Sequence, residues 1–355
     1  ELFEAIENND IEKVKLLVKN GVNVNYIKKE FVAREIILKK AHTALILASD
    51  KGYLEIVKYL VEHGADINAK NWYGDTALMY AVEKGYSDIA KYLVESGADI
   101  NTENAIGETL LRLASKKGNL EIVKYLVENG ANNINNALIT ATINDNLEVV
   151  KFLIEHGADI NNNNGKTALI TASEKGYLEI VKYLVENGSD INVKSFIKLN
   201  EHNFLDGTNA LMHAVKEGHL EISKYLIEHG ANDINEALIL VSEKGYLEIV
   251  KYLVERGADI NFKNRYDKTA LIIASKKGYL EIAKYLIENG ASYINEALIE
   301  ATVNVNLGVA QCLMEHGADI NYKDNNGKTA LTLALENEKL RIVAYFIEKC
   351  GDINA

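Results

Sequence analysis

The strongest constraint on this chain is a repeat with a period of 33 residues. Residues 43–75 read TALILASDKGYLEIVKYLVEHGADINAKNWYGD, and the pattern recurs at once over residues 76–108. The glycine before the second apolar run stands at Gly52, Gly85 and Gly118, which is two steps of 33. A period of this length indicates one supersecondary unit per copy, because each unit can bury its apolar faces only by stacking on its neighbours. The period therefore predicts a solenoid.

Each unit has the pattern of two helices followed by a polar turn. Thr43 offers a side-chain oxygen where a first helix should begin, and Gly52 should break that helix. A second helix is predicted over 54–63, where the few charged residues fall on one outward stripe. Residues 65–75 are rich in Asp, Asn and Gly, which favours a projecting hairpin between units. We call this projecting segment a finger and number it by the repeat that it follows.

The repeated unit resembles the ankyrin repeat. The resemblance rests on T-A-L-x-x-A, L-E-I-V-x-Y-L and G-A-D-I-N at this spacing, and it covers nearly the whole chain. It implies an all-α ankyrin-repeat solenoid of about eleven helix-turn-helix units, with short β-hairpin fingers at the long junctions. The chain departs from the family where Ala44-Leu45-Ile46 replaces the frequent Pro-Leu-His, and it has no proline. Its composition, rich in Lys, Asn, Ile, Tyr and Glu, also looks like that of the ankyrin families of amoeba-infecting giant DNA viruses.

The repeats are predicted to form a single solenoid over residues 1–355. Repeats are expected to start near residues 1, 43, 76, 109, 135, 167, 209, 235, 269, 295 and 329. Two junctions, 27–42 and 194–208, are enlarged. Three others, within 130–138, 230–238 and 290–298, lack six residues and should lead from helix to helix without a finger. The candidates to cap the helices that follow are Asn135, Asn235 and Asn295.

Composition limits the classes of partner. The net charge is −12 with acids and bases interspersed, whereas nucleic-acid binding needs a basic face, so we expect no nucleic-acid partner. The segment 27–42, where basic residues outnumber acidic ones, is the place where an exception is expected. Cys312 and Cys350 form neither a disulfide framework nor a metal spacing, which favours a reducing intracellular compartment, the cytoplasm of a host cell if the chain is viral. No run is apolar enough to cross a membrane, and we expect a monomer without a membrane partner.

Polar residues that recur with the repeat have structural explanations. His63 and its counterparts His156, His229 and His316 stand near the ends of second helices, too far apart for a metal array, and should interact with the helix C-terminus. Asn68 and its counterparts close each G-A-D-I-N phrase and should hold the turn; the resemblance also permits hydroxylation there. We expect no catalytic residues, no cofactor and no metal, and therefore no enzyme.

A lysine ends many of the first helices, and an acidic residue precedes several of these lysines. The set is Lys51, Lys84, Lys117, Lys175, Lys244 and Lys277. This pattern favours a solvated edge of mixed charge over a track for an acidic partner, although both interpretations stay open. Only Lys116–Lys117 and Lys276–Lys277 are predicted to lack local compensation.

Departures from regularity provide the candidate binding residues. Finger tips need only Asn, Asp and Gly, yet several carry Trp, Tyr, Ile or Arg, and Trp, Tyr and Arg are enriched in interface hot spots. The enlarged junctions add phenylalanines, which could equally fold each insertion against its own repeats. The candidates are Trp72, Tyr73, Ile106, Arg265, Tyr266, Phe31, Phe196 and Phe204.

These patterns predict a protein-protein interaction module or scaffold. It should bind partner proteins through its hairpin tips and the concave surface of its first helices. The alternative is the targeting arm of a larger protein, a ubiquitin-ligase adaptor or effector enzyme, with its active segment outside residues 1–355. A weaker third interpretation is a structural spacer.

Overall fold

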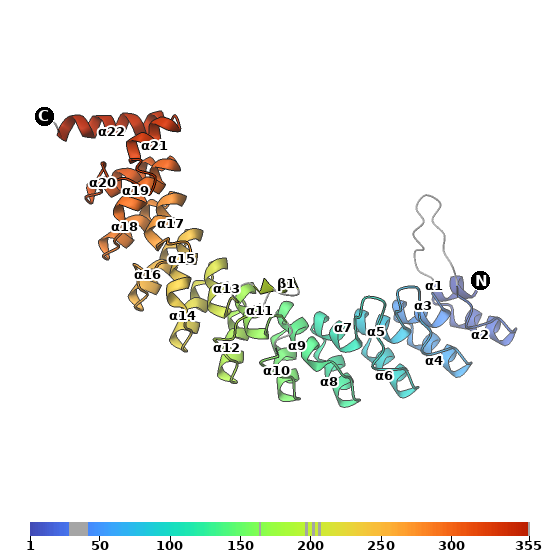
Figure 1. Cartoon of the computed structure of the whole chain (residues 1–355). Coiled ribbons are helices and arrows are strands. Elements are labelled where there is room, and N and C mark those ends of the chain that lie inside the picture. The colour runs from blue at the N-terminus through green and yellow to red at the C-terminus, as the bar shows by residue number, and fades with distance from the viewer. Residues whose placement is uncertain (28–41, 163–164, 196–197, 201–202, 205–206, 354–355) are drawn as a thin grey trace. The chain divides into compact units, whose positions relative to one another are not determined.

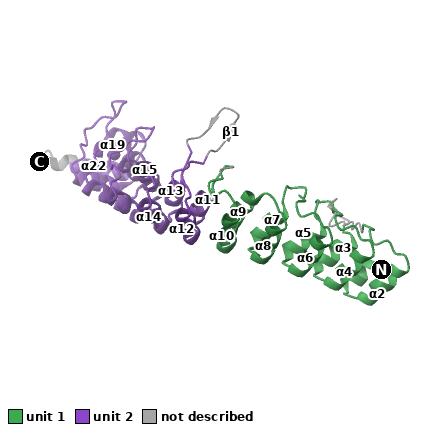
Figure 2. Ribbon diagram, turned by 90° about the horizontal axis from the view of Figure 1, so that it is seen from below, with its two compact units in different colours: residues 1–168 green, residues 169–355 purple. Residues whose placement is uncertain are grey.

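Helices dominate the structure, a computed structural model that describes residues 1–27, 42–162, 165–195, 198–200, 203–204 and 207–353. For residues 198–200, 203–204 and 350–353 it describes the backbone only. The chain forms two compact units, residues 1–168 (unit 1) and 169–355 (unit 2; Figure 2). The predicted all-α class is confirmed.

Unit 1 is a stack of helical pairs. Its first helices are α1 (Leu2–Glu7), α3 (Ala44–Lys51), α5 (Ala77–Lys84), α7 (Leu110–Lys117) and α9 (Ile134–Ile143). Its second helices are α2 (Ile11–Lys19), α4 (Leu54–Glu62), α6 (Ser87–Glu95), α8 (Leu120–Glu128) and α10 (Leu147–Glu155). Each first helix packs on the next first helix, and each second helix on the next second helix, which gives two layers (Figure 1).

Unit 2 begins within α11 (Ala168–Lys175) and repeats this arrangement. Its further first helices are α13 (Ala210–Glu217), α15 (Ile234–Lys244), α17 (Ala270–Lys277), α19 (Ile294–Val303) and α21 (Ala330–Glu336). Its second helices are α12 (Leu178–Glu186), α14 (Leu220–Glu228), α16 (Leu247–Glu255), α18 (Leu280–Glu288), α20 (Leu307–Glu315) and α22 (Leu340–Ile353). The core runs between the layers, where Leu126 of α8 and Leu253 of α16 occupy equivalent, fully buried positions.

The expected signals set the helix ends. Thr43 caps α3, because its hydroxyl oxygen accepts a hydrogen bond from the Ile46 amide at 3.2 Å. Gly52 ends α3 at φ 79°, in the left-handed region. A Cβ there would also lie 2.7 Å from the Tyr86 ring, which stacks over the glycine from the next repeat. Replacing Gly52 by any residue with a Cβ would therefore disturb both the left-handed turn and the contact with the Tyr86 ring.

Fingers are held by asparagine side chains more than by strand pairing. In finger 2 the Asn71 Oδ1 accepts hydrogen bonds from the backbone amides of Tyr73 and Asp75, both at 2.9 Å. The strands assigned within the described residues are β1 (Lys198–Asn200) and β2 (Asn203–Phe204), which pair antiparallel in the enlarged junction. The other enlarged junction lies largely outside the described residues, at 28–41.

The three shortened junctions pass directly from helix to helix. The prediction that Asn135, Asn235 and Asn295 cap the helices that follow is wrong. Helix α9 begins at Ile134, after Asn133 at φ 60°, so Asn135 already lies inside the helix. The counterparts of Asn133 are Asp233 and Tyr293, both at φ 62°. One left-handed residue turns the chain straight into the helix, so no side-chain cap is formed at these positions.

The last helix differs from the others. Helix α22 has 14 residues, whereas the second helices before it have nine. It continues through Cys350, which replaces the glycine that ends its counterparts. A Cβ disfavours the left-handed conformation by about 1–2 kcal/mol, so the helix has no reason to stop there. No helix among the described residues is long and apolar enough to cross a membrane.

Candidate functional site

Fingers 2 (65–75) and 3 (98–108) of unit 1 bring three candidate residues together. Trp72 is 62% exposed, Tyr73 49% and Ile106 80%. The two tips are joined because the Ala105 amide donates a hydrogen bond to the Tyr73 carbonyl at 2.8 Å. We call Trp72, Tyr73 and Ile106 the fingertip ridge. It presents large apolar side chains that the described chain covers only in part.

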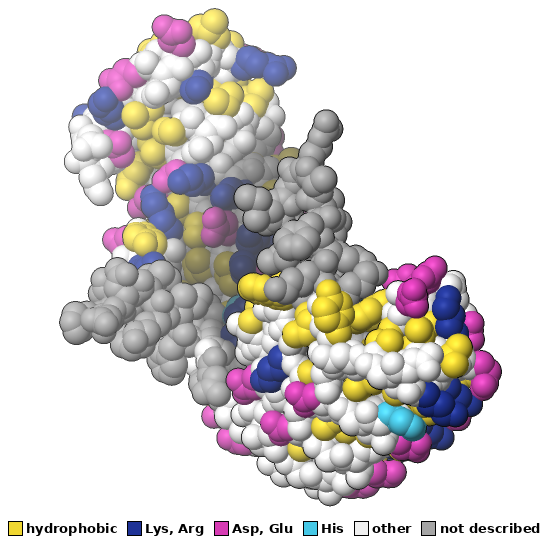
Figure 3. Space-filling view, turned by 90° about the vertical axis from the view of Figure 1, so that its right-hand side faces the viewer, with side chains coloured by type: hydrophobic (Ala, Val, Ile, Leu, Met, Phe, Trp, Pro, Cys, Tyr) yellow, Lys and Arg dark blue, Asp and Glu magenta, His cyan; other side chains and the backbone are white. Residues whose placement is uncertain are grey.

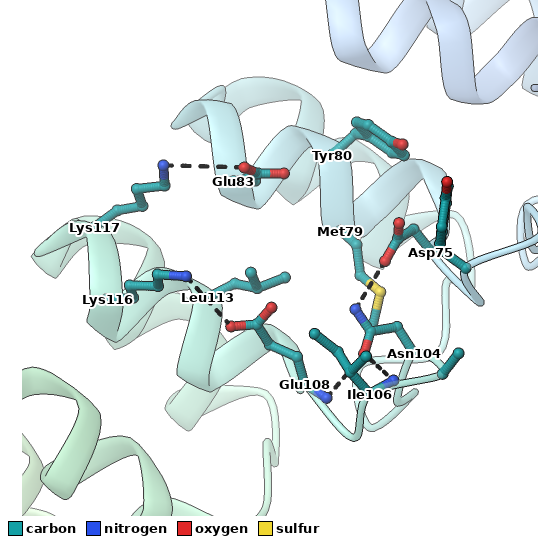
Figure 4. A pocket seen from close by; sticks show the side chains of 12 residues that line it. Asp75, Met79, Tyr80, Glu83, Asn104, Ile106, Glu108, Leu113, Lys116 and Lys117 are labelled. Carbon is teal, nitrogen blue, oxygen red and sulfur yellow. Dashed lines mark hydrogen bonds and ion pairs between the residues drawn. The ribbon is translucent and has the colours of Figure 1, made fainter. Parts of the chain in front are cut away.

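A pocket of about 270 Å³ opens beside the ridge, between the two fingers and helices α5 and α7 (Figure 4). Its lining includes Met79 and Tyr80 of α5 and Leu113 of α7. Burial raises the pKa of Tyr80 to about 12, and the Tyr80 hydroxyl accepts a hydrogen bond from Asn71 Nδ2 at 3.1 Å. The pocket thus combines apolar walls with a phenol that stays neutral.

The two lysines at the pocket are each paired with a glutamate, within or across repeats. Lys117 Nζ lies 4.0 Å from a Glu83 carboxylate oxygen of the preceding repeat, and Lys116 Nζ lies 3.9 Å from Glu108 (Figure 4). Lys277 pairs with Glu243 in the same way at 3.4 Å. The prediction that Lys116–Lys117 and Lys276–Lys277 lack compensation is therefore wrong for three of these four lysines. Their partners lie in a stacked helix or a finger, which sequence neighbours do not reveal.

Finger 8 (258–268) of unit 2 carries the next two candidates. Tyr266 is 66% exposed, and the Arg265 guanidinium carbon lies 4.9 Å from the Tyr266 ring centroid. A cavity of about 350 Å³ lies against this finger and helix α15, lined by Glu236, Ile239 and residues 262–266. The preceding junction (within 230–238) and the following one (within 290–298) are both shortened, so finger 8 has no finger beside it.

The remaining candidates are not placed. Phe31 and Phe196 lie outside the described residues, and for Phe204 the structure gives only a backbone position in β2. In contrast, Met79, Tyr80 and Leu113 line the pocket although the sequence did not single them out. The sequence places these three residues on first helices, but they line a pocket only because the repeats stack.

The comparisons with known proteins identify the repeat. The family model "Ankyrin repeats (3 copies)" matches residues 2–104, 110–195, 193–264, 231–297 and 293–355. The chain belongs to the ankyrin-repeat family. The predicted ankyrin-repeat solenoid is thereby confirmed.

Two curated relatives and one solved structure illustrate the likeness. The mouse (Mus musculus) "B-cell lymphoma 3 protein homolog" is 37% identical over 75 residues, 21% of this chain and 14% of that protein. A "Putative ankyrin repeat protein" of Rickettsia bellii (strain RML369-C) is 33% identical over 89 residues, 21% of this chain and 37% of that protein. The human ASB11 ankyrin repeat domain matches with a TM-score of 0.50 and 24% identity, over 56% of this chain and 90% of that one. The last likeness concerns the fold alone.

Within these ankyrin repeats, the asparagine of the G-A-D-I-N motif links neighbouring repeats. Asn25 Oδ1 accepts a hydrogen bond from the Asp66 amide at 2.7 Å, and its Nδ2 donates to the Gly64 carbonyl at 3.0 Å. The same two bonds are made by Asn68, Asn101, Asn192 and Asn261. The sequence predicts that these asparagines hold the turn, and the structure shows that the turn bonded by each side chain belongs to the next repeat. Each asparagine is a staple to the next repeat.

At the shortened junctions, the three asparagines predicted as helix caps bond to the next repeat from inside a helix. Asn135, Asn235 and Asn295 accept hydrogen bonds from the amides of Asp159, Asp259 and Asp319 at 2.7–2.8 Å. The staple is thus kept where the finger is lost.

The histidines at the ends of the ankyrin second helices are structural. In His63, Nδ1 lies 2.8 Å from the Tyr59 carbonyl, and its ring stacks on Tyr59 with centroids 3.9 Å apart. His156, His229 and His316 repeat the carbonyl contact at 2.7–2.8 Å. The predicted interaction with the helix C-terminus is confirmed. Among the described residues, no group of three or more His, Cys, Asp or Glu is placed to hold a metal.

Proposed function

We propose that this chain is a protein-binding module whose main contact surface in unit 1 is the fingertip ridge. Ankyrin repeats are generally protein-protein interaction modules. The single observation that supports this site is the joint exposure of Trp72, Tyr73 and Ile106 on two tips that hydrogen-bond to each other. Exposed, contiguous apolar side chains of these types are the kind of surface on which binding energy is concentrated.

The pocket beside the ridge receives an apolar side chain of the partner. Met79, Tyr80 and Leu113 give it an apolar wall, its lysines are paired with Glu83 and Glu108, and the Asp75 carboxylate accepts hydrogen bonds from Asn71 and Asn104. The ridge then packs around this anchor and excludes water from it. Finger 8, with Arg265 and Tyr266, is a second contact surface in unit 2.

The partner that we propose is a protein and not a nucleic acid or a membrane. The net charge of −12 repels phosphates, and on the face in Figure 3 acidic and basic side chains lie interspersed. We further propose a monomer that works in a reducing intracellular compartment. The amino-acid composition of the repeats, which looks like that of giant-virus ankyrin families, suggests a more specific proposal: a viral protein that binds a host protein.

The alternative role is a targeting arm for a ubiquitin-ligase adaptor or an effector enzyme. The same ridge would then select the target, and a segment beyond residues 1–355 would act on it. The natural sequence beyond either end separates the two roles, because an adaptor needs a recruiting or catalytic segment there.

The test is a double variant, Trp72→Ala/Tyr73→Ala, with a partner captured from the native cellular setting. Loss of two hot-spot residues should weaken binding by at least about 30-fold, since even one such residue contributes about 2 kcal/mol or more. The matched control is Lys58→Ala, on the outward stripe of α4, which should leave affinity unchanged. Equal affinity of the double variant and the control, with both proteins folded, would move the contact surface elsewhere.

A further inference from the structure

At one first-helix position, the apolar residues that follow a regular finger are buried, whereas polar residues there, such as Arg112 and Thr332, are not. Met79 of α5 and Ile272 of α17 are buried, and each follows a full finger. The equivalent residues of α9, α15 and α19 follow shortened junctions and are only half-buried: they are Ile139, Ile239 and Ile299. Loss of a finger therefore uncovers an apolar residue at the start of the next repeat.

Unit 1 shows what a finger does in this place. Finger 2 lies against finger 3, where the Asp75 carboxylate accepts a hydrogen bond from Asn104 Nδ2 at 2.9 Å. The Tyr73 carbonyl accepts one from the Ala105 amide at 2.8 Å, and Lys70 Nζ donates one to the Glu103 carbonyl at 3.2 Å. Finger 3 thus receives an acidic side chain and a backbone carbonyl from its neighbour.

Finger 8 has the same internal geometry but no preceding finger. Asn264 stands at the position of Asn104, and its Oδ1 accepts hydrogen bonds from the amides of Tyr266 at 2.9 Å and Lys268 at 3.1 Å. Its Nδ2 donates to none of the described residues, whereas Asn104 Nδ2 reaches Asp75. The cavity of about 350 Å³ between Ile239 and finger 8 is lined by Lys263, Asn264 and Arg265, which stand at the positions of the finger 3 residues that contact finger 2 in unit 1.

We propose that this cavity, the vacant-finger niche, binds a turn of another protein in place of the missing finger. The niche is lined by Glu236, Ile239, Phe262, Lys263, Asn264, Arg265 and Tyr266. An apolar side chain of the turn packs on Ile239, and a carboxylate accepts from Asn264 Nδ2 as Asp75 does from Asn104. Because Lys263 lies 3.5 Å from the Asp267 carboxylate, the preference for an acidic turn rests mainly on the Asn264 Nδ2 donor.

The niche at α15 is better equipped for this than the one at α19. Finger 10 (318–328), which follows α19 and α20, has Asp324 at the position of Asn264. Asp324 accepts the two amide bonds that hold the finger, from Asn326 at 2.9 Å and Lys328 at 2.8 Å, but it has no donor to offer a carboxylate. The α19 position therefore serves as an internal control. This inference rests on the second contact surface proposed for finger 8 and does not depend on the fingertip ridge.

The experiment uses a fluorescent cyclic peptide with the sequence of residues 70–76, KNWYGDT, titrated into the full chain. Saturable binding to the wild-type protein is expected. The variant Asn264→Asp should weaken it at least about 10-fold, since a donor becomes a repelling acceptor. The finger should stay folded in this variant, because Asp324 already holds finger 10 by the same two bonds. A peptide with Asn in place of its Asp should also bind more weakly.

Matched variants make the outcome specific. Ile239→Glu should abolish binding, while Ile299→Glu, the equivalent change at α19, and Trp72→Ala/Tyr73→Ala should leave it unchanged. The proposal is overturned if the wild-type protein does not bind the peptide, if Asn264→Asp binds equally well, or if Ile299→Glu loses as much as Ile239→Glu. Loss in the Trp72→Ala/Tyr73→Ala protein would place the peptide on the ridge, against the niche. Self-association that Ile239→Glu abolishes would assign the niche to a second copy and equally overturn the proposal.

Discussion

Fingers 2 and 3 of unit 1 support each other, whereas finger 8 of unit 2 stands alone. All three use an asparagine to close the turn, through Asn71, Asn104 and Asn264. The difference arises outside them, from the six residues that are missing in the junction before α15. Their loss leaves the staple in place through Asn235 but exposes Ile239 and the edge of finger 8. A repeat array can thus change its surface while its stacking stays the same.

The core should not distinguish the two regions. Leu126→Ala in unit 1 and Leu253→Ala in unit 2 each truncate a fully buried side chain, and each should lower the free energy of unfolding by about 2–5 kcal/mol. Lys58→Ala is the surface control and should change it by less than about 0.5 kcal/mol. Urea denaturation followed by circular dichroism measures all three. A midpoint for either leucine variant equal to that of the control would mean that the faces are misassigned.

The fingers should distinguish the regions clearly. Asn104→Asp sets a second carboxylate beside Asp75 in place of the hydrogen bond at 2.9 Å, and should cost about 1.5–3 kcal/mol of stability. Asn264→Asp has no such neighbour and should cost less than about 0.5 kcal/mol. Equal losses in thermal or urea unfolding would contradict the distinction between paired and lone fingers.

The staples should differ in strength between the two kinds of junction. Asn68→Ala removes two hydrogen bonds to the next repeat and should cost about 1–2 kcal/mol. Asn235→Ala removes one, but it also places a better helix former inside α15, so its net cost should be under about 1 kcal/mol. Hydrogen exchange at the Asp99 and Asp259 amides reports each staple directly. Faster exchange at Asp259 alone would reverse the expected order.

The last expected effect concerns pH and is tested at Tyr80 of unit 1, one of several tyrosines in both units whose pKa is raised by burial. Burial raises the pKa of Tyr80 to about 12, above the ordinary value of 10.0, so folding favours the neutral phenol. This contribution to stability is complete below pH 10 and is lost as the pH rises through about 12. Tyr80→Phe should flatten that part of the stability profile. Unit 2 has Leu240 at the equivalent position, so Leu240→Ala should leave the slope unchanged; an identical slope in Tyr80→Phe would contradict the assignment.

Local features of the fold could be predicted from the sequence because they depend on neighbours along the chain. The 33-residue period, the cap at Thr43 and the turn at Gly52 follow from spacing and side-chain chemistry, and the structure has them. The exposure of Trp72, Tyr73 and Ile106 was also predictable, since a finger tip has little protein to cover it. Asn135 was misassigned because a left-handed residue, Asn133, began the helix without a cap.

The sequence by itself determined the repeat, its helices and the chemistry at each finger tip. The tertiary structure alone decided which residues meet between repeats, such as Asn68 with the next repeat and Lys117 with Glu83. It also decided that Ile239 is only half-buried. The physical reason is that these contacts join residues about one repeat apart, whose distance is set by how the layers stack. Periodicity along the chain fixes which face is buried, but only stacking fixes what each exposed group finds opposite it.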